Sequence, residues 1–431
     1  MRLLIVTYYF PPSGGAGVQR TLKLTKYLRS HGVEPVVLTV EAGAYPSLDP
    51  TLEADVPPGV RVIRTRALDP FGLYGALTGR SREDAVAVGS VGEARSVGER
   101  LGLWARANVF LPDARVGWVP FAAREARRLV RAGEVDAVLT SGPPHSTHLV
   151  GLRLRRLLSS RGLPWVADFR DPWTGINFYD ELPMSAAARA LDRRLERRVL
   201  RSADAVVTVS PTWARELDAK GGLPAGTVRV IANGFDPDDV AGPAVAPSRE
   251  TFDLVYVGSL YGSRDPETLW RAVEALRARG RVPRLRIRLV GRVDDAVRSS
   301  LRDHGLSDAA HEIGVVPHAE AVRAMRGAAL LFLSVEPVSN AAGILTGKLY
   351  EYLASGRPVL ALGPVGADAD QLLRRTGGGA LFDRADAHGL AESLREQYAE
   401  WAQGRPRAGA SAEALVPLSR REQAGHLASL V

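Results

Sequence analysis

Apolar and polar positions follow two periods along the chain, and their alternation predicts repeated strand–helix units. Short apolar runs, each long enough for a buried strand, lie at 3–7, 33–40, 62–65, 137–140, 254–257, 285–289 and 330–333. In the segments between them apolar residues recur every three to four positions, which is typical of a helix with one buried face. Strands that alternate with helices favour parallel sheets, so the fold class is α/β.

Two segments break this alternation. Residues 66–115 are rich in Gly, Ser and Arg, show poor periodicity, and are longer than an ordinary connection. Their aromatic residues, with one just beyond them, are Phe71, Tyr74, Trp104, Phe110 and Trp118. Two interpretations stay open: a lid or acceptor-binding surface, and a disordered insertion packed by its own aromatic side chains.

The second break divides the chain into domains. Residues 232–249 are rich in Pro, Gly and Asp and lack periodicity, as expected of an interdomain linker. We therefore expect a Rossmann-like domain at 1–236, a linker at 237–250 and a second Rossmann-like domain at 251–405. Residues 406–431 are expected to end in a helix that can pack back on the first domain.

The stretch G-I-L-T-G-K-L-Y-E-Y-L-A-S-G-R-P-V-L at 343–360 predicts a glycine-bearing loop, a short helix and a buried strand. Lys348 and Glu351 fall in the first turns of that helix. A helix N-terminus attracts anions through its free N–H groups and its dipole. A lysine there favours a phosphate site, and a carboxylate offers an acceptor for sugar hydroxyls. The alternative is a surface helix with an ion pair at i, i+3.

A second phosphate-binding element is expected at V-G-S-L-Y-G-S-R-D, residues 257–265. Glycines and the hydroxyl of Ser259 follow a strand here, and Arg264 can donate two parallel hydrogen bonds to a phosphate. Arg264 and Lys348 would then approach one sheet edge from different loops. Such a pair can hold a diphosphate when no metal is present.

The first strand is followed by a similar loop, Y-Y-F-P-P-S-G-G-A-G at 8–17. Its G-G-x-G spacing is not the dinucleotide G-x-G-x-x-G, and a tight turn explains it equally well. His145 follows a later strand, and Asp168, Arg170 and Asp171 follow the next. Since the carboxyl ends of parallel strands share one edge, these four side chains predict a functional rim on the acceptor or sugar side.

Composition narrows the partners of the chain. It has 431 residues, 45% apolar and 24% charged, and contains no cysteine, so disulfides and thiolate metal sites are excluded. This fits a reducing cytoplasm. The net charge of +8 comes from arginine, since only four lysines occur. It favours anionic partners, but the arginines are dispersed and no nucleic-acid motif appears, so nucleic acid is not an expected partner.

Two further charged features have competing interpretations. The predicted helix at 186–201 carries six arginines, which suit either peripheral contact with anionic lipid at the inner membrane face or a solvated outer face. Asp368 and Asp370 form a D-x-D pair like a metal motif, yet aspartates also favour the first turn of a helix. We interpret them as capping residues and expect neither a metal nor another cofactor.

Several of these motifs together resemble the GT-B glycosyltransferases, and within them glycosyltransferase family 4. The matching pieces follow one another over nearly the whole chain: Y-Y-F-P-P-S-G-G-A-G-V-Q-R, S-G-P-P-H-S-T-H, D-F-R-D-P-W, S-A-D-A-V-V-T-V-S, I-A-N-G-F-D, Y-V-G-S-L and G-K-L-Y-E-Y-L-A-S-G-R-P-V. The resemblance implies two Rossmann-like parallel-sheet domains that face each other across a cleft. It also implies a retaining, nucleotide-sugar-dependent transferase.

The resemblance assigns roles to individual residues. Arg264 and Lys348 would bind the donor diphosphate and act in catalysis, and Glu351 would hold the nucleotide ribose. The backbone at Leu345 and Thr346 would lie near the phosphates.

In the first domain, Gly15 and Ala16 would approach the phosphate or sugar from the opposite side, and His145 would contact the sugar and act in catalysis. One departure stands out. Many members carry a glutamate eight positions before the ribose glutamate, where it touches the donor sugar, but here that position is Gly343. Glu336 lies seven residues too early.

The expected function is transfer of a hexose from a nucleoside-diphosphate sugar, with UDP-sugar favoured, to a hydroxyl acceptor. Glycan, glycolipid or envelope polysaccharide synthesis is the expected setting, without a metal. Two alternatives stay open: a sugar-nucleotide epimerase of the same architecture, and a nucleotide-sugar-binding partner with weakened catalysis.

Overall fold

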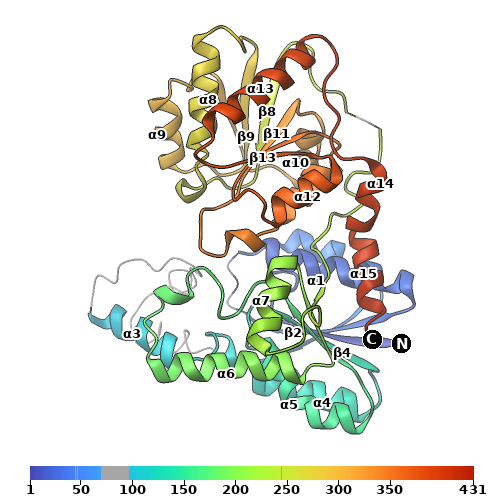
Figure 1. The fold of residues 1–431 in the computed structure, drawn as a ribbon. Coiled ribbons are helices and arrows are strands. Elements are labelled where there is room, and N and C mark those ends of the chain that lie inside the picture. Colours follow the sequence, from blue (N-terminus) through green and yellow to red (C-terminus); the bar gives the residue numbers. More distant parts are fainter. Residues whose placement is uncertain (44, 46, 69–96, 244) are drawn as a thin grey trace. The chain divides into compact units, whose positions relative to one another are not determined.

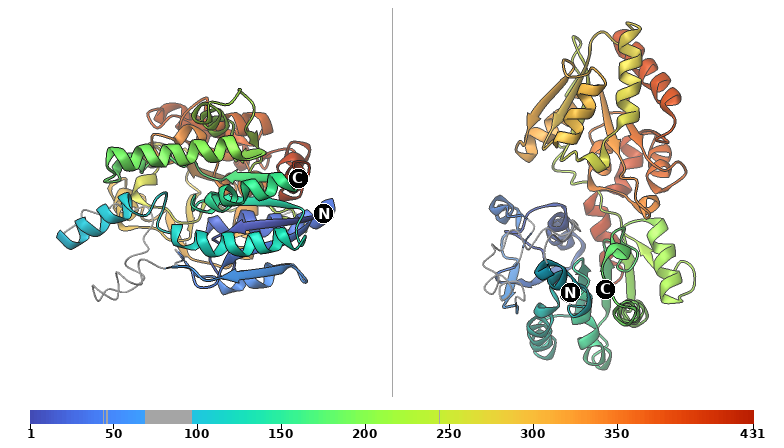
Figure 2. Two further views of the ribbon diagram at one scale, coloured as in Figure 1. Left: turned by 90° about the horizontal axis from the view of Figure 1, so that it is seen from below. Right: turned by 90° about the vertical axis from the view of Figure 1, so that its left-hand side faces the viewer.

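A computed structural model describes residues 1–43, 45, 47–68, 97–243 and 245–431. The chain forms two compact units (Figure 1). Unit 1 contains Met1–Ala232 and Gln423–Val431, and unit 2 contains Asn233–Glu422. Both ends of the chain therefore belong to unit 1, where they lie near one another (Figure 2).

Unit 1 is built on a seven-stranded parallel sheet in the order β3-β2-β1-β4-β5-β6-β7. Its strands are β1 (Arg2–Thr7), β2 (Glu34–Val40), β3 (Arg61–Thr65), β4 (Ala137–Gly142), β5 (Trp165–Phe169), β6 (Ala205–Thr208) and β7 (Arg229–Val230). Its helices are α1 (Ala16–Tyr27), α3 (Val97–Asn108), α4 (Val119–Arg131), α5 (Thr147–Ser160), α6 (Ala186–Ser202), α7 (Pro211–Gly221) and most of α15 (Arg420–Ala428).

Alternate residues of β1 face two different helix layers. Leu4 and Val6 are buried in one cluster with residues of α4, α5, α6 and α7. Leu3 and Ile5 are buried in another with residues of α1 and α15. Successive side chains of a strand point to opposite faces, so helices cover both sides of this sheet. The sequence of β1 is therefore a continuous apolar run and does not alternate with polar residues.

Unit 2 has a six-stranded parallel sheet in the order β10-β9-β8-β11-β12-β13. Its strands are β8 (Phe252–Val257), β9 (Leu285–Val290), β10 (Ala310–Gly314), β11 (Leu330–Ser334), β12 (Val359–Leu362) and β13 (Gly379–Phe382). Its helices are α8 (Glu267–Ala278), α9 (Asp295–Asp303), α10 (His318–Arg326), α11 (Gly347–Ala354), α12 (Asp368–Thr376), α13 (Ala387–Ala402) and α14 (Ala412–Leu415).

The core of unit 2 follows the same rule. Tyr256, Phe332 and Leu360 belong to one buried cluster with residues of α8, α9 and α13. Val255 and Leu331 are the strand neighbours of Tyr256 and Phe332, so they point to the opposite face of the sheet, and they are also fully buried. Both faces of this sheet are therefore apolar, as expected of a doubly wound α/β unit.

The α/β class and the parallel sheets are confirmed, and three details differ from expectation. Helix α3 lies within the segment 66–115, for which no helix was predicted. Helix α7 was not predicted, although Ser210 caps its N-terminus, Pro211 opens it and Gly222 ends it in the left-handed region. The chain end was predicted as one helix. Pro417 lies in a 3₁₀ turn that separates α14 from α15, since proline cannot donate the backbone hydrogen bond a helix interior needs.

No helix in the described part of the chain has the length and apolar character needed to cross a bilayer.

Candidate active site

Each sheet has one point at which strand order changes direction, between β1 and β4 in unit 1 and between β8 and β11 in unit 2. Ligands of doubly wound sheets bind beside such points, at the carboxyl ends of the strands. The loops after β1 and β4 carry Gly15 and His145. Those after β8 and β11 carry Arg264 and lead to Lys348. The topology thus brings the predicted residues of each unit to one edge of its sheet.

In unit 2, Lys348 crosses from α11 to the end of β8. Its ammonium Nζ donates to the hydroxyl of Tyr256 at 2.9 Å and lies 4.5 Å from the centre of that ring. Gly258 makes room for it, because a Cβ there would collide with Nζ and Cε of Lys348. Gly258 also has φ of 114°, a conformation that other residues rarely adopt.

Burial changes the acidity of both partners. Burial, and then the nearby charge of Arg264, lower the pKa of Lys348 to about 8, against the opposing effect of Glu351. Burial raises the pKa of Tyr256 to about 12. A desolvated ammonium that is short of negative neighbours is well suited to attract an anionic ligand.

Arg264 lies in the short 3₁₀ turn after β8, Gly262–Arg264. Its Nε donates to Oε2 of Glu336 at 3.0 Å, and both side chains are partly exposed. Glu336 comes from the loop after β11. Glu336 is therefore the ion-pair partner of Arg264, although it was not among the predicted site residues.

Helix α11 presents its N-terminus to the same region. Thr346 is the N-cap residue, but its side chain caps no N–H group, and its Oγ1 is buried without a partner among the described residues. The first N–H groups of a helix have no partner inside the helix. The carbonyl of Leu345 accepts from Asn233 Nδ2 at 3.4 Å. This N-terminus and the ammonium of Lys348 are both groups that favour an anionic ligand.

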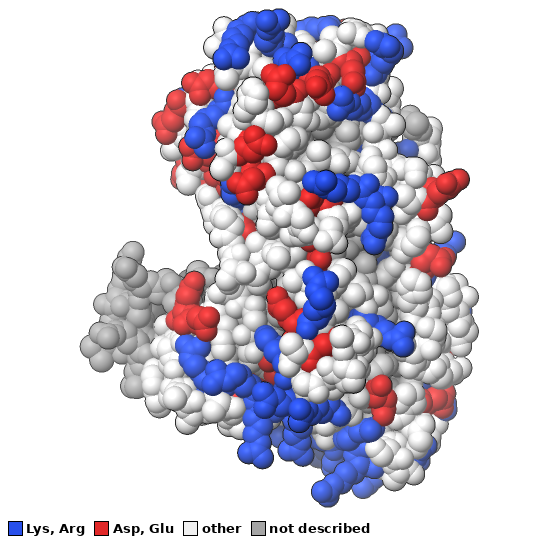
Figure 3. Space-filling model, in the orientation of Figure 1, with Lys and Arg blue, Asp and Glu red and all other residues white. Residues whose placement is uncertain are grey.

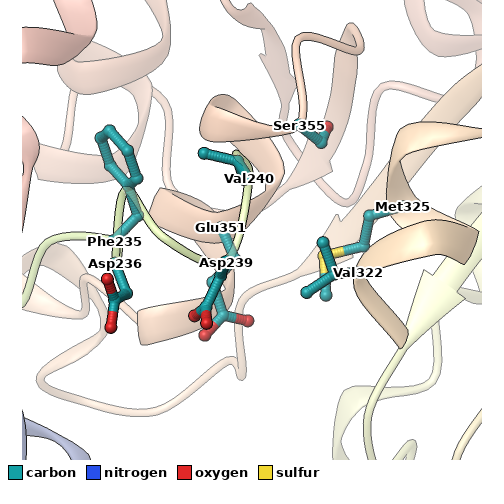
Figure 4. A pocket seen from close by; sticks show the side chains of 8 residues that line it. All are labelled: Phe235, Asp236, Asp239, Val240, Val322, Met325, Glu351 and Ser355. Atoms are coloured by element: carbon teal, nitrogen blue, oxygen red, sulfur yellow. The ribbon is translucent and has the colours of Figure 1, made fainter. Parts of the chain in front are cut away.

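Glu351 lines a small pocket formed by Phe235, Asp236, Asp239, Val240, Val322, Met325, Glu351 and Ser355 (Figure 4). Burial raises the pKa of the Glu351 carboxyl, and the charges of Arg420 and His318 oppose this rise. Of the predicted site residues of unit 2, Glu351 is thus the one whose carboxylate lines this pocket, and it lies about one turn along α11 from Lys348.

The D-x-D pair opens α12. Asp370 accepts from the backbone N–H of Gly366 at 2.8 Å and from Arg374 Nε at 2.8 Å. The bond from Gly366 satisfies a backbone group at the start of α12, as a capping role requires, while Arg374 lies one turn farther along the helix; the N-cap residue itself is Ala367. No cluster of three potential ligands for a metal occurs among the described residues.

In unit 1, the loop before α1 is tied to a neighbouring segment. The backbone N–H of Gly14 donates to the carbonyl of Ser47, and that of Asp49 donates to the carbonyl of Pro12. Gly15 precedes α1 with φ of 85°, and Ala16 is the first residue of the helix. This places both at the N-terminus of α1, beside the switch point of the first sheet.

His145 is almost completely buried in a stack of rings. Its ring lies 5.3 Å from that of Trp173, with 8° between the planes, and 5.9 Å from that of His148. Neither ring nitrogen of His145 has a partner of acceptable geometry among the described residues. Burial, and then the charges of His148 and Arg170, lower the pKa of His145 well below its usual value. His145 is therefore an uncharged side chain packed among aromatic rings in the loop after β4.

Asp168 and Arg170 are both buried and use their polar atoms inside unit 1. Asp168 accepts from Arg20 of α1 and from Ser141 Oγ at 2.8 Å. Arg170 donates from Nε to the carbonyl of Gly142 at 3.1 Å and from its terminal nitrogens to the carbonyls of Gly17 and Pro143. The two residues hold α1 and the loop of His145 against β5, so their partners here are protein groups.

Asp171 behaves differently from its neighbours. It is partly exposed, and burial raises the pKa of its carboxyl, while the charge of Arg170 opposes this rise.

The aromatic residues of the segment 66–115 have different positions. Phe71 and Tyr74 lie outside the described residues, and Trp104 in α3 is 49% exposed. Trp118, which follows that segment, is fully buried and donates to Thr65 Oγ1 at 2.9 Å, so it belongs to the core.

Reasoning from the sequence missed three contributors. Tyr256 and Gly258 contact Lys348, and Trp173 stacks on His145. The motif Y-V-G-S-L contained the first two, but their contact with a residue 92 positions away could not be inferred from spacing.

Comparison with known proteins agrees with this architecture. Residues 14–239 match the model of Glycosyltransferase Family 4, and residues 251–400 match that of Glycosyl transferases group 1. The first match alone spans more than half of the chain. The chain belongs to glycosyltransferase family 4. No curated protein sequence matches it at a significant level.

Solved structures show the same fold. Sucrose-phosphate synthase from Thermosynechococcus elongatus has a TM-score of 0.60 at 16% identity, covering 99% of this chain and 94% of that one. HepE from Anabaena, in complex with UDP and glucose, has a TM-score of 0.56 at 17% identity, covering 100% and 95%. A putative UDP-N-acetylglucosamine 2-epimerase from Listeria monocytogenes has a TM-score of 0.54 at 14% identity, covering 99% and 94%.

The family and the GT-B fold together make this protein a glycosyltransferase, an enzyme that transfers a sugar.

Proposed function

We propose that this glycosyltransferase takes its sugar from a nucleoside-diphosphate sugar, with a UDP-sugar as the favoured donor, and that unit 2 binds this donor. One observation carries the proposal. Arg264, from the turn after β8, and Lys348 with the N-terminus of α11 are cationic or electropositive groups that two separate segments bring to the switch point of one sheet. A diphosphate is the anion whose size and charge suit such an arrangement.

These groups would stabilise the leaving diphosphate. As the bond to the sugar breaks, negative charge grows on the departing phosphate oxygen. Arg264 and Lys348 are positioned cations that would stabilise this growing negative charge. Their site is partly buried, where electrostatic interactions are strong. They would supply the stabilisation that a metal supplies in other transferases, so the proposed reaction is metal-independent.

The proposed transfer keeps the anomeric configuration. In a reaction on one face of the sugar, the departing phosphate oxygen itself takes the proton of the acceptor hydroxyl, and no side chain need form a covalent bond. Burial keeps the ring of His145 uncharged, so it suits contact with a sugar hydroxyl better than with a charged phosphate.

Unit 1 is proposed to serve the acceptor, a hydroxyl on a glycan, a glycolipid or an envelope polysaccharide. Gly15 and Ala16 would approach the phosphate or sugar, and Asp171 is the carboxylate of the rim that remains partly exposed. Asp168 and Arg170 would act by holding these loops in place. A UDP donor is favoured because the HepE structure of the same fold contains UDP and glucose.

A donor panel tests the proposal. The protein is screened by thermal shift against nucleoside diphosphates and their sugars, since a ligand that binds the native state raises its apparent stability. Release of nucleoside diphosphate is then measured with a panel of hydroxyl acceptors. Lys348→Ala is expected to lower turnover about 10²–10³-fold, by analogy with the loss of a single oxyanion donor.

Lys26→Ala is the matched control, because Lys26 also lies over a tyrosine ring, 4.9 Å from the centre of Tyr27, on α1. Turnover of Lys348→Ala equal to that of the Lys26 variant would contradict the donor assignment. Two other outcomes point to other functions. Isomerised donor without acceptor, seen by NMR, indicates an epimerase like the Listeria neighbour. Binding without transfer indicates a partner protein weakened by Gly343.

A further inference from the structure

Three neighbouring helices of unit 1 concentrate arginine on one layer. Helix α4 packs beside α5, and α5 beside α6, on one face of the sheet (Figure 1). Together the three helices contain thirteen arginines and three acidic residues. The arginines are Arg124, Arg127, Arg128, Arg131, Arg153, Arg155, Arg156, Arg189, Arg193, Arg194, Arg197, Arg198 and Arg201.

The acidic residues of α6 point inward. Asp192 is buried and accepts from Trp173 Nε1 and from the hydroxyl of Tyr179, each at 2.9 Å. Glu196 is buried and accepts from the backbone N–H and the hydroxyl of Thr174. Both carboxylates thus fix the chain after β5, and the exposed side of α6 keeps cationic groups without compensating acids.

Most of these arginines lack ion pairs. Arg128, Arg155 and Arg189 pair with acidic residues. The other ten are exposed and form no ion pair with any residue in the described ranges. Figure 3 shows blue side chains gathered over the part of unit 1 where α6 and its neighbours lie. We call these ten arginines and the surface between them the cationic face.

We propose that the cationic face docks this enzyme on an anionic lipid bilayer. Helices that lie side by side offer a broad layer of guanidinium groups, which can each bind a lipid phosphate with two hydrogen bonds. Leu191 on α6 is 48% exposed among the arginines, as in helices that lie at the lipid interface. The exposed large apolar side chains of the described parts of these helices include no aromatic ring on which a nucleic-acid base could stack.

Vesicle sedimentation of the full chain tests this surface. The protein is mixed with vesicles of phosphatidylcholine, or of phosphatidylcholine with added phosphatidylglycerol. We expect binding to the anionic vesicles only, weakened by high salt. The triple variant Arg194→Gln, Arg197→Gln, Arg198→Gln is expected to bind at least about tenfold more weakly, because each basic residue near the surface contributes to the attraction.

The control variant replaces three exposed arginines of unit 2, Arg279, Arg302 and Arg375, and is expected to bind like the unmodified protein. Thermal shift by the nucleoside diphosphate found in the donor panel verifies that the variants remain folded. Equal binding to both kinds of vesicle, or an equal loss in the control, would overturn the proposal. So would tight binding of duplex DNA at a salt concentration where anionic vesicles are not bound.

A second inference concerns Glu336 and rests on the proposed donor site. Glu336 engages only Nε of Arg264, and the two terminal nitrogens of that guanidinium have no partner among the described residues. The loop that carries Glu336 is itself fixed, since Arg384 donates to Ser334 Oγ and to the carbonyl of Val335. A carboxylate held in this way sets the orientation of the guanidinium plane.

The geometry points to Glu336 as a positioning residue, which leaves the terminal nitrogens of Arg264 directed at the donor diphosphate. A planar guanidinium binds two phosphate oxygens only in the correct orientation. Glu336→Ala is therefore expected to weaken nucleoside diphosphate binding about tenfold, by the loss of one well-oriented contact. Glu336→Gln keeps an acceptor for Nε and is expected to bind nearly as well as the unmodified protein.

A double-mutant cycle separates orientation from general damage. In the background Arg264→Ala, the change Glu336→Ala is expected to have no further effect on diphosphate binding, measured by calorimetry. Glu312→Ala, which removes one of the two acidic partners of Arg298, is the control for loss of an exposed ion pair in unit 2. Tighter diphosphate binding by Glu336→Ala would overturn the inference, since Glu336 would then compete with the ligand. Absence of binding in the unmodified protein would instead contradict the proposed function.

Discussion

Lys348 owes its chemical character to its neighbours. The ring of Tyr256 covers it, Arg264 lies close enough to disfavour its charge, and Gly258 leaves the space that it fills. Its pKa of about 8 lies below the value of 10.5 that is usual for a lysine. At neutral pH the group is charged yet poorly compensated, so a bound diphosphate would both pair with it and stabilise its proton.

A pH dependence follows from this pKa. The ammonium loses its proton as pH rises through about 8, and only the charged form attracts a diphosphate. The dissociation constant for a nucleoside diphosphate is therefore expected to rise about tenfold between about pH 7 and pH 9. Calorimetric titration across this range measures it.

Lys348→Arg is the control, because an arginine stays charged throughout that range. Its affinity is expected to change little between the two pH values. The same loss of affinity in the arginine variant would show that another group titrates.

At the scale of elements, α11 is anchored to β8 by one side chain. The backbone N–H of Val257 donates to the hydroxyl of Tyr352 at 2.8 Å, and Tyr352 is fully buried. This bond joins the helix that carries Lys348 to the end of the strand that precedes Gly258. The two parts of the proposed donor site are thus held in register by a bond between distant segments.

Tyr352→Phe removes this bond and leaves a buried N–H group without a partner. We expect the free energy of unfolding to fall by about 1–3 kcal/mol and diphosphate binding to weaken. Urea unfolding and calorimetry measure the two effects.

Tyr398→Phe offers a matched comparison. Tyr398 accepts from the backbone N–H of Arg284 at 3.1 Å, on a helix, α13, that does not carry the site. It is expected to lose a similar amount of stability without losing affinity. Unchanged affinity in Tyr352→Phe would mean that α11 does not need this anchor.

At the scale of the whole molecule, the chain leaves unit 1 at Ala232 and returns to it at Gln423. Ala424 and Leu427 of α15 are buried with Leu3 and Ile5 of β1. The first and last elements of the sequence therefore complete one core, and unit 1 needs the end of the chain to cover one face of its sheet.

Leu427→Ala is expected to lower the free energy of unfolding of unit 1 by about 2–5 kcal/mol, because it opens a cavity in a fully packed core. Hydrogen exchange should become faster in β1 and α1, which share that core.

Val416→Ala, at a side chain that is 60% exposed, is the control and is expected to change stability by less than about 0.5 kcal/mol. Faster exchange confined to unit 2 in Leu427→Ala would contradict the assignment of α15 to unit 1.

Much of the fold could be predicted because its signals are local. Apolar runs of four to eight residues marked the strands, and glycine loops marked the carboxyl ends of several of them. Helix α7 was missed although Ser210, Pro211 and Gly222 carry ordinary helix-end signals. Arg264 and Lys348 could be predicted as phosphate-binding residues because each lies in or just after a glycine-bearing loop, which is visible in the sequence.

The sequence by itself determined the α/β class, the family resemblance, and which loops lie at the carboxyl ends of strands. These depend on residues a few positions apart. Only the tertiary structure decided that Glu336 holds Arg264, that Tyr256 and Gly258 surround Lys348, and that Asp168 and Arg170 bind protein groups. These contacts join segments tens of residues apart, and burial, which sets the charge of Lys348, exists only once the chain has folded.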